Sequence, residues 1–304
     1  MLGPPLWNLF FNDVAQPAAS QGGTPSVFAD DLNVFQRFDR ETPNRDIERS
    51  MHLCRVRVHH WGNINRVAFD PGKEHIVILR PRDGCGDPFK LLGLLVDVKL
   101  IMQQAIEKIL SQIRPKIKAI LRTKPYYSVG ELINQFKTHV WGLMEIHNGG
   151  IFHASDYLLQ KLDSAQHGFL IDLGVEEADA FLQHNFAPPS LRRNIGVLGL
   201  LQKRVLGLSH PVFQDLLPYH VDVFGSLRPG EHDKQLYGHI LNVQYQQALH
   251  GRSIFSMVYV YNRLPQDVVD SKCVTSFQTC LTCMARKACE DGDPKWANHF
   301  SCRM

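Results

Sequence analysis

The 304-residue chain lacks several features that mark specialised classes of protein. No stretch reaches the roughly 18 uncharged apolar residues of a membrane helix, and the opening MLGPPLWNLFFNDVA lacks the basic segment of a signal peptide. No internal repeat or low-complexity tract is present in the sequence. The seven cysteines are odd in number and mostly lie near the end, which disfavours a secreted disulfide framework. We therefore expect a soluble intracellular protein with reduced thiols, in the nucleus or the cytoplasm, and no membrane partner.

The chain also lacks a strong charge of either sign. Its net charge is +3, with 44% hydrophobic and 21% charged residues, which suits one large or two to three ordinary globular domains. This balance does not by itself indicate nucleic-acid binding, so any such indication must come from local clusters of charge.

Two adjacent carboxylates stand out in the sequence SVFADDLNVF, where Asp30 and Asp31 interrupt an apolar, β-forming run. Charge in such a setting needs compensation by a metal ion, a basic partner or solvent at a turn. The pair is thus either a metal site or simply a polar hairpin turn, since Asp is favoured in turns.

The first 97 residues alternate short apolar runs with turn signals and predict mixed helix and strand. The expected elements are a helix over 6–14, a loop over 17–25, a β-hairpin over 27–37 with the aspartates at its tip, a helix over 43–62, a strand, turn and strand within 66–79, and a strand over 89–97. The helix over 43–62 carries a stripe of apolar residues at spacings of three and four: Ile47, Met51, Cys54, Val58 and Trp61.

Residues 98–165 have helical spacing and the only clear basic stripe of the chain. The segment from position 99 to 124 contains a single acidic residue, Glu107. It contains seven basic residues, namely Lys99, Lys108, Arg114, Lys116, Lys118, Arg122 and Lys124. Basic helices bind phosphate backbones, but the stripe could equally be an ordinary solvated face. Residues 166–304 predict short helices broken at Pro188-Pro189, Pro211, Pro218, Pro229 and Pro265.

Four segments in order resemble one known family. They are LGPPLWNLFFNDV, FADDLNVF, WGNINRVAFDPGKEHIVIL and FKLLGLLVDVKL. Together they are similar to the second half of the palm of reverse transcriptases from non-LTR (LINE-type) retrotransposons, from motif B onward. APPSLRRNIGVLGLLQKRVLG and YNRLPQDVVDSKCVTSFQTCL also resemble the helical region that follows such polymerases.

The resemblance implies an RNA-directed DNA polymerase, a nucleotidyltransferase with a two-metal mechanism. Asp30 would be the principal Mg²⁺ ligand of the hairpin and Asp31 its neighbour. Lys73 would match the motif D lysine that assists pyrophosphate departure, although it could be a plain surface lysine. FKLLGLL would match the strand that grips the primer, and the basic helices would match the thumb on an RNA template and DNA primer.

The chain departs from the family in two ways that affect activity. Its sequence starts inside motif B, without the motif A aspartate and the fingers, and the PQG that opens motif B is missing. A two-metal site with part of its carboxylates should hold ions poorly. We therefore expect a fragment that is catalytically silent by itself; its oligomeric state is left open.

A second possible metal site lies near the end of the sequence. Cys280, Cys283, His299 and Cys302 have spacings that could hold zinc. The alternative is that Cys280 and Cys283 are small core residues of a helix. His59-His60 precedes Trp61 and is expected to serve surface and packing.

These features lead to an α/β (α+β) fold in three parts. We expect a partial reverse-transcriptase palm with a β-hairpin catalytic motif over 1–97, a helical thumb-like region over 98–165 and a helical C-terminal region over 166–304. The alternative is a non-catalytic nucleic-acid-binding or interaction module, or a degenerate gene fragment.

Overall fold

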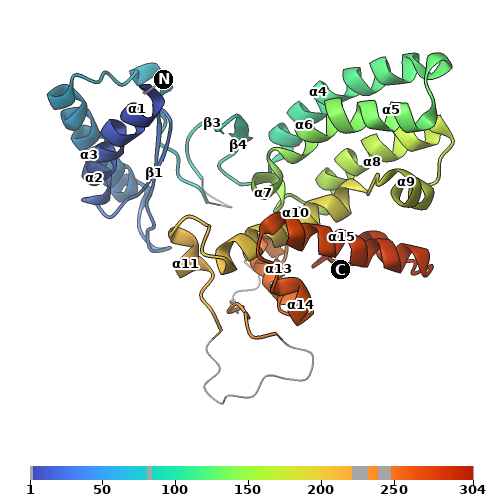
Figure 1. Ribbon diagram of the computed structural model, residues 1–304. Helices are drawn as coiled ribbons and strands as arrows, with labels where there is room; N and C mark the ends of the chain where they lie inside the picture. The colour runs from blue at the N-terminus through green and yellow to red at the C-terminus, as the bar shows by residue number, and fades with distance from the viewer. Residues whose placement is uncertain (1–2, 81–83, 221–231, 239–247, 304) are drawn as a thin grey trace. The chain divides into compact units, whose positions relative to one another are not determined.

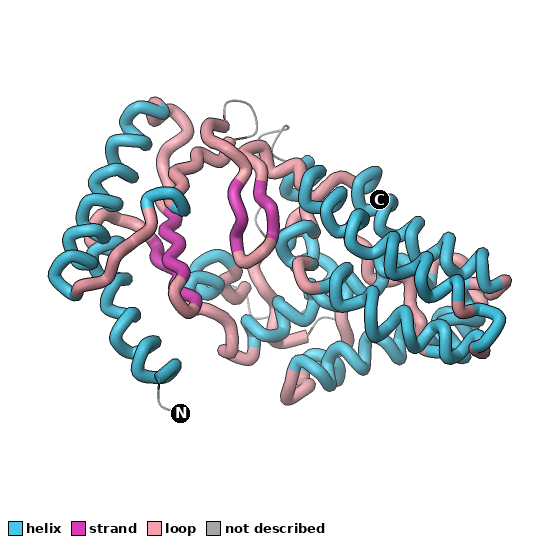
Figure 2. Tube along the Cα trace, turned by 90° about the horizontal axis from the view of Figure 1, so that it is seen from above, coloured by secondary structure: helices cyan, strands magenta, loops and turns pink. Residues whose placement is uncertain are grey.

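The computed structural model describes residues 3–80, 84–220, 232–238 and 248–303 (Figure 1). The chain forms two compact units, one of residues 1–89 and 97–99 and the other of residues 90–96 and 100–304. Both contain helix, and the described strands form two short antiparallel hairpins (Figure 2). The chain is thus of the α+β class, and residues 100–165 share one unit with residues 166–304.

The first unit packs three helices against one hairpin. Its elements are α1 (Gly3–Phe11), α2 (Ala15–Ala19), β1 (Thr24–Phe28), β2 (Asp31–Phe35) and α3 (Asn44–Asn65), with 3-10 turns η1 (Asn12–Val14) and η2 (Pro71–Lys73). Its buried core is formed by Phe11, Val14, Ala18, Cys54 and Val58. Because Cys54 and Val58 are four residues apart, they lie on one face of α3, as the apolar stripe predicts.

Two predictions for this unit are wrong. The segment 17–25 is not all loop, because α2 continues to Ala19 and β1 begins at Thr24. The strands within 66–79 do not form either. Val67 and Phe69 instead pack against the core, and Ile78 pairs only with Cys85 in an isolated bridge. The turn expected between these two strands is present, and in it Asp70 Oδ1 accepts a hydrogen bond from Gly72 N at 2.9 Å.

The segment predicted as one strand over 89–97 is a tight hairpin. Strands β3 (Phe89–Leu91) and β4 (Leu94–Val96) are joined by Leu92 and Gly93, which both have positive φ, 47° and 87°. A two-residue turn of this kind fits the twist of a hairpin. Leucine rarely adopts positive φ, so the sequence gives little sign of this turn.

The second unit is mostly helical, as predicted. Its helices are α4 (Gln103–Arg122), α5 (Val129–Phe136), α6 (Gly142–Glu145), α7 (Asn148–Ile151), α8 (Asp156–Leu173), α9 (Glu177–His184), α10 (Pro189–Val205), α11 (Val212–Leu216), α13 (Ile254–Tyr261), α14 (Gln266–Val269) and α15 (Val274–Glu290), with 3-10 turns η3 (Lys124–Tyr126) and η5 (Trp296–Asn298). Several prolines mark helix boundaries as expected: α10 begins at Pro189, and Pro211 and Pro265 precede α11 and α14. Pro229 lies outside the described residues.

The larger core of this unit lies around α10. Leu191, Leu198 and Leu201 of this helix are fully buried and pack with Phe277 and Leu281 of α15. Both helices have 17 residues, so the short helices expected throughout 166–304 are wrong for these two. Their length follows from an apolar face that continues over several turns.

One turn of π-helix, η4 (Lys137–Trp141), joins α5 to α6 without interrupting the helix. It directs Trp141 into a cluster where its ring stacks on Phe186 at 5.1 Å and its Nε1 donates to Gln166 Oε1 at 2.9 Å. The guanidinium of Arg192 lies 3.6 Å from the centre of the same ring. The π turn therefore anchors this helix to α8 and α10.

Across the described residues, no helix combines the length and the apolar character needed to span a membrane.

Candidate functional site

The predicted hairpin around the aspartates is confirmed. Strand β1 pairs with β2 from Thr24 opposite Phe35 to Phe28 opposite Asp31, so Ala29 and Asp30 form the turn. Asp31 is the first residue of β2, and both carboxylates are exposed. Helix α3 follows at Asn44 with Pro43 as its N-cap, one residue after the predicted start at 43.

Helix α1 holds the turn in place. Trp7 Nε1 donates to the carbonyl oxygen of Ala29 at 3.3 Å, and the Trp7 ring stacks on buried Phe11 at 5.2 Å. Ala29 has φ of 54°, a conformation that L-residues rarely adopt. The sequence does not indicate this role of Trp7, because the bond joins residues 22 positions apart to a backbone atom.

The carboxylates of Asp30 and Asp31 are suitable ligands for Mg²⁺, but two carboxylates are fewer than a two-metal site needs. Their oxygens are the hard ligands that Mg²⁺ prefers, but two-metal chemistry needs further carboxylates to fix both ions. Among the described residues, no three His, Cys, Asp or Glu side chains form a group that could hold a metal ion. The described residues therefore do not form a two-metal catalytic site.

Lys73 ends the turn η2 with its side chain exposed. A carboxylate oxygen of the next residue, Glu74, lies 2.7 Å from His59 Nε2, and the other lies 4.0 Å from Arg55 Nε. The His59 ring meets Phe69 edge-on at 5.6 Å, while His60 is exposed. The surface and packing roles expected of the two histidines thus match their positions.

Helix α4 presents the most clearly organised charge of the chain. Its buried face consists of Ala105, Ile106, Ile109, Leu110, Ile113, Ile117 and Ile120. Arg114, Lys118 and Arg122 are exposed and follow one another at intervals of four, so they form a row along the opposite face. We call these three residues the α4 row. The burial of the isoleucines fixes which way the row points.

No acid neutralises the α4 row within the part of the chain that the structure describes. Glu107, the acid of α4, accepts a hydrogen bond from Gln103 Nε2 at 2.8 Å. Glu131 on α5 is held in a capping box with Ser128, whose hydroxyl and backbone N–H lower the pKa of Glu131. The row is therefore an uncompensated positive strip.

The other four basic residues of the predicted stripe lie off this row. Lys99 precedes α4 and belongs to the first unit, whereas Lys108 is half-buried. Lys116 is exposed but is not part of the four-residue repeat. Lys124 follows α4, and its Nζ donates to the backbone oxygen of Asp172. The stripe of seven thus contains one coherent row of three.

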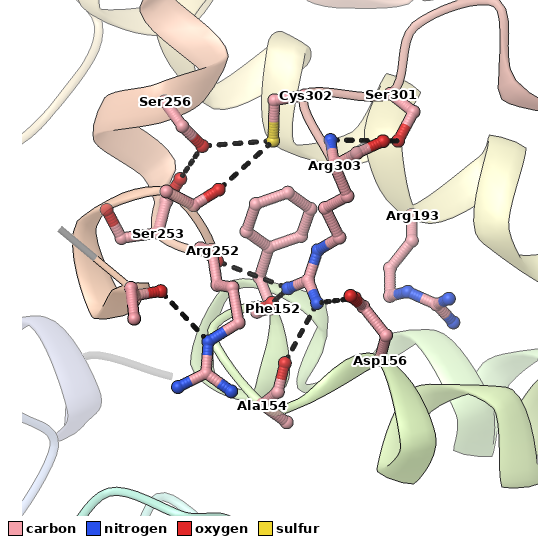
Figure 3. A network of polar contacts seen from close by, with 12 residues as sticks. Phe152, Ala154, Asp156, Arg193, Arg252, Ser253, Ser256, Ser301, Cys302 and Arg303 are labelled. Atoms are coloured by element: carbon pink, nitrogen blue, oxygen red, sulfur yellow. Dashed lines mark hydrogen bonds and ion pairs between the residues drawn. The ribbon is translucent and has the colours of Figure 1, made fainter.

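The structure does not bring the four possible zinc ligands together. Cys280 is half-buried against the larger core, as the packing alternative predicts, but Cys283 is exposed. Cys302 Sγ accepts from Ser256 Oγ at 2.9 Å, and burial raises the pKa of this thiol (Figure 3). Zinc needs thiolate ligands, which a raised pKa opposes.

The surroundings of Cys302 are instead organised by Arg303 (Figure 3). Its guanidinium donates to the backbone oxygens of Ala154 at 2.9 Å and Arg252 at 3.2 Å, and it also bonds Phe152 O and the carboxylate of Asp156. These contacts tie residues after α15 to the segment before α8. The role of these hydrogen bonds is structural, because the Arg303 guanidinium donates to backbone oxygens and to one carboxylate.

Comparison with protein-family models, curated proteins and solved structures finds no match for this chain. The resemblance to reverse transcriptases therefore rests on the sequence motifs.

Proposed function

We propose that this chain binds nucleic acid through the α4 row as a part of a reverse-transcriptase-like protein. The observation that supports this most directly is the exposed repeat of Arg114, Lys118 and Arg122 opposite a fully apolar face. The sequence resemblance points to the same partner, a primer-template duplex.

The spacing of the row suits a phosphate backbone. Residues four apart in an α-helix rise by about 6 Å, so the row spans about 12 Å. Phosphates along one strand of B-form DNA recur every 3.4 Å along the axis, so the row can follow about four nucleotides. Contact of this kind positions a strand without reading its bases.

The competing interpretation is an ordinary solvated helix face. It predicts that the row contributes to solubility alone and that its charge does not affect nucleic-acid affinity.

The experiment reverses the row with Arg114→Glu, Lys118→Glu and Arg122→Glu in one variant. A matched variant, Lys203→Glu, Lys272→Glu and Lys295→Glu, makes the same change in net charge at exposed lysines elsewhere in the second unit. Both are compared with the parent by fluorescence anisotropy on one labelled duplex over a range of salt.

If the row contacts phosphates, reversing it should cost about 1 kcal/mol per contact, about 100-fold in affinity overall. The slope of log affinity against log salt should fall by about 2 to 3, since each phosphate contributes roughly 0.7–0.9. The matched variant should keep the slope of the parent. Equal slopes for all three proteins would refute the proposal.

Asp30 and Asp31 are exposed at a hairpin turn, and the resemblance implies a part of a polymerase site for this arrangement. Because two carboxylates are too few for a two-metal site, we expect no primer extension by the purified chain with Mg²⁺ or Mn²⁺. Deoxynucleotide incorporation that depends on the template and disappears in Asp30→Ala would overturn this expectation and establish a polymerase.

A further inference from the structure

An exposed aromatic residue follows the α4 row in the chain. Tyr126 is the last residue of η3, four positions after Arg122, and the chain stays in helical turns between them. The residue is 83% exposed, the largest value among the exposed large hydrophobic and aromatic residues that the structure describes. A large aromatic side chain in such a position can bury much apolar surface when a partner binds it.

The backbone under Tyr126 is fixed. Its N–H donates to the Thr123 oxygen at 2.9 Å, and Ser128 caps α5 two residues later through reciprocal bonds with Glu131. A tyrosine on a fixed backbone has two side-chain torsions to order, so binding through its ring costs little entropy.

Tyr126 differs from Tyr157 and Tyr259, the two next most exposed of the described tyrosines of this unit, in having no cation over its ring among the described residues. Lys161 Nζ lies 4.7 Å from the Tyr157 ring, and the Arg263 guanidinium lies 3.9 Å from the Tyr259 ring. Within the described part of the chain, no cation or ring covers Tyr126. The ammonium of neighbouring Lys124 is instead held by the Asp172 carbonyl.

A positive row that leads to an open aromatic ring is the combination that single-stranded nucleic acids recognise. The cations follow the backbone, and the ring stacks on a base that must be unpaired to reach it. In a continuous duplex the bases are stacked on one another, so the ring has no partner there. A protein partner would bury the ring equally well, but the cations beside it favour a polyanion.

We propose that Tyr126 stacks on an unpaired base and that α4 thereby prefers single-stranded nucleic acid, or the single-stranded overhang of a primer-template, to a blunt duplex. This inference rests on the proposed function, because the α4 row supplies the backbone contacts.

The test uses the full chain with a 12-nucleotide single strand that carries one 2-aminopurine, and with the blunt duplex of the same sequence. Four proteins are compared: the parent, Tyr126→Ala, Tyr126→Phe, and Tyr157→Ala as a matched removal of an exposed tyrosine. Anisotropy gives the affinity, and quenching of 2-aminopurine reports stacking directly.

Tyr126→Ala should weaken binding to the single strand by roughly 5- to 150-fold, which corresponds to the range of about 1–3 kcal/mol for one stacked base. It should abolish the quenching, and it should leave duplex affinity and the salt slope unchanged. Tyr126→Phe should retain binding and quenching because the ring alone stacks, and Tyr157→Ala should behave as the parent.

The failure of this inference and that of the proposed function give different results. If Tyr126→Ala binds and quenches as the parent does, or if the parent prefers the duplex, the stacking inference is wrong while the α4 row can still bind phosphate. If reversal of the α4 row changes the affinity neither for the single strand nor for the duplex, the proposed function is wrong. Loss of self-association in Tyr126→Ala, without change in binding, would assign the ring to a protein contact and overturn the inference.

Discussion

Acidification should destabilise the second unit through His232. This histidine is fully buried, its Nδ1 accepts from Lys234 N at 3.1 Å, and its Nε2 lies 3.0 Å from the Tyr261 carbonyl oxygen, to which it donates. Both bonds are satisfied by one neutral tautomer with its proton on Nε2. A second proton on Nδ1 would break the bond from Lys234 and place a charge in the core.

The direction of the pH effect follows from this geometry. Burial lowers the pKa of His232 below its ordinary 6.5, and this outweighs the opposing effects of the Tyr261 bond and of Asp233 and Asp270; Lys234 lowers it further. The unfolded chain therefore binds more protons than the folded chain below about pH 6.5. Stability from this residue is complete above that pH and falls as pH decreases toward the folded pKa.

The largest possible effect is set by linkage. While His232 stays neutral in the folded state, each pH unit below 6.5 reduces the free energy of unfolding by about 1.4 kcal/mol. Between pH 6.5 and about pH 5 the reduction is then at most about 2 kcal/mol. His147, whose pKa is also lowered by burial and by Lys108, adds to the same trend.

The assay is urea unfolding of the parent and His232→Asn at several pH values from about 7.5 to 5. Asparagine keeps an acceptor for Lys234 N–H but has no proton to bind, so the variant is less stable at neutral pH and its stability changes less with pH. His60→Asn, at an exposed position on α3, controls for the loss of one histidine. Parallel pH profiles for the parent and His232→Asn would refute the reasoning.

Two further predictions concern the same unit. Tyr261→Phe removes a fully buried hydroxyl that donates to Gln202 Oε1 at 2.6 Å, so it should lower the free energy of unfolding by about 1–3 kcal/mol. Tyr157→Phe, at an exposed position, is the control. Equal losses of stability in the two variants would contradict the prediction. Hydrogen bonding with Ser276 lowers the pKa of exposed Cys273, whose Sγ lies 3.3 Å from Ser276 Oγ and accepts from the Ser276 backbone N–H at 3.4 Å. Iodoacetamide at pH 7 should therefore alkylate Cys273 faster than exposed Cys283. Ser276→Ala should reduce that difference, and equal rates at the two thiols in the parent would count against it.

Periodic patterns of apolar residues predicted the helices well. The stripe through Ile47, Cys54 and Val58 gives α3, and the isoleucines of α4 carry its helix through Pro115, a residue that ends most helices. The strands within 66–79 failed because β-forming residues make a strand only when another strand is available to pair. Such pairing depends on contacts distant in sequence, which a local pattern does not contain.

For the candidate sites, local signals were again the reliable ones. The turn at Asp30 and the exposure of Arg114, Lys118 and Arg122 follow from residues nearby in sequence. The possible zinc site required segments distant in sequence to meet. The spacing of its four residues did not indicate that Cys302 Sγ accepts a hydrogen bond from Ser256 Oγ. Tyr126 was missed because the local sequence does not indicate whether a tyrosine just after a helix is exposed, as this one is.

The π turn at Lys137–Trp141 has a consequence for how this chain would align with any relative. A π turn contains one residue more than an α turn, and each residue rotates a helix by about 100°. Deleting one residue here would leave an unbroken helix but would turn Trp141 away from Phe186 and Arg192. A relative with a plain α-helix at this point would thus align with a one-residue gap inside the helix, at the place where the tryptophan cluster is lost.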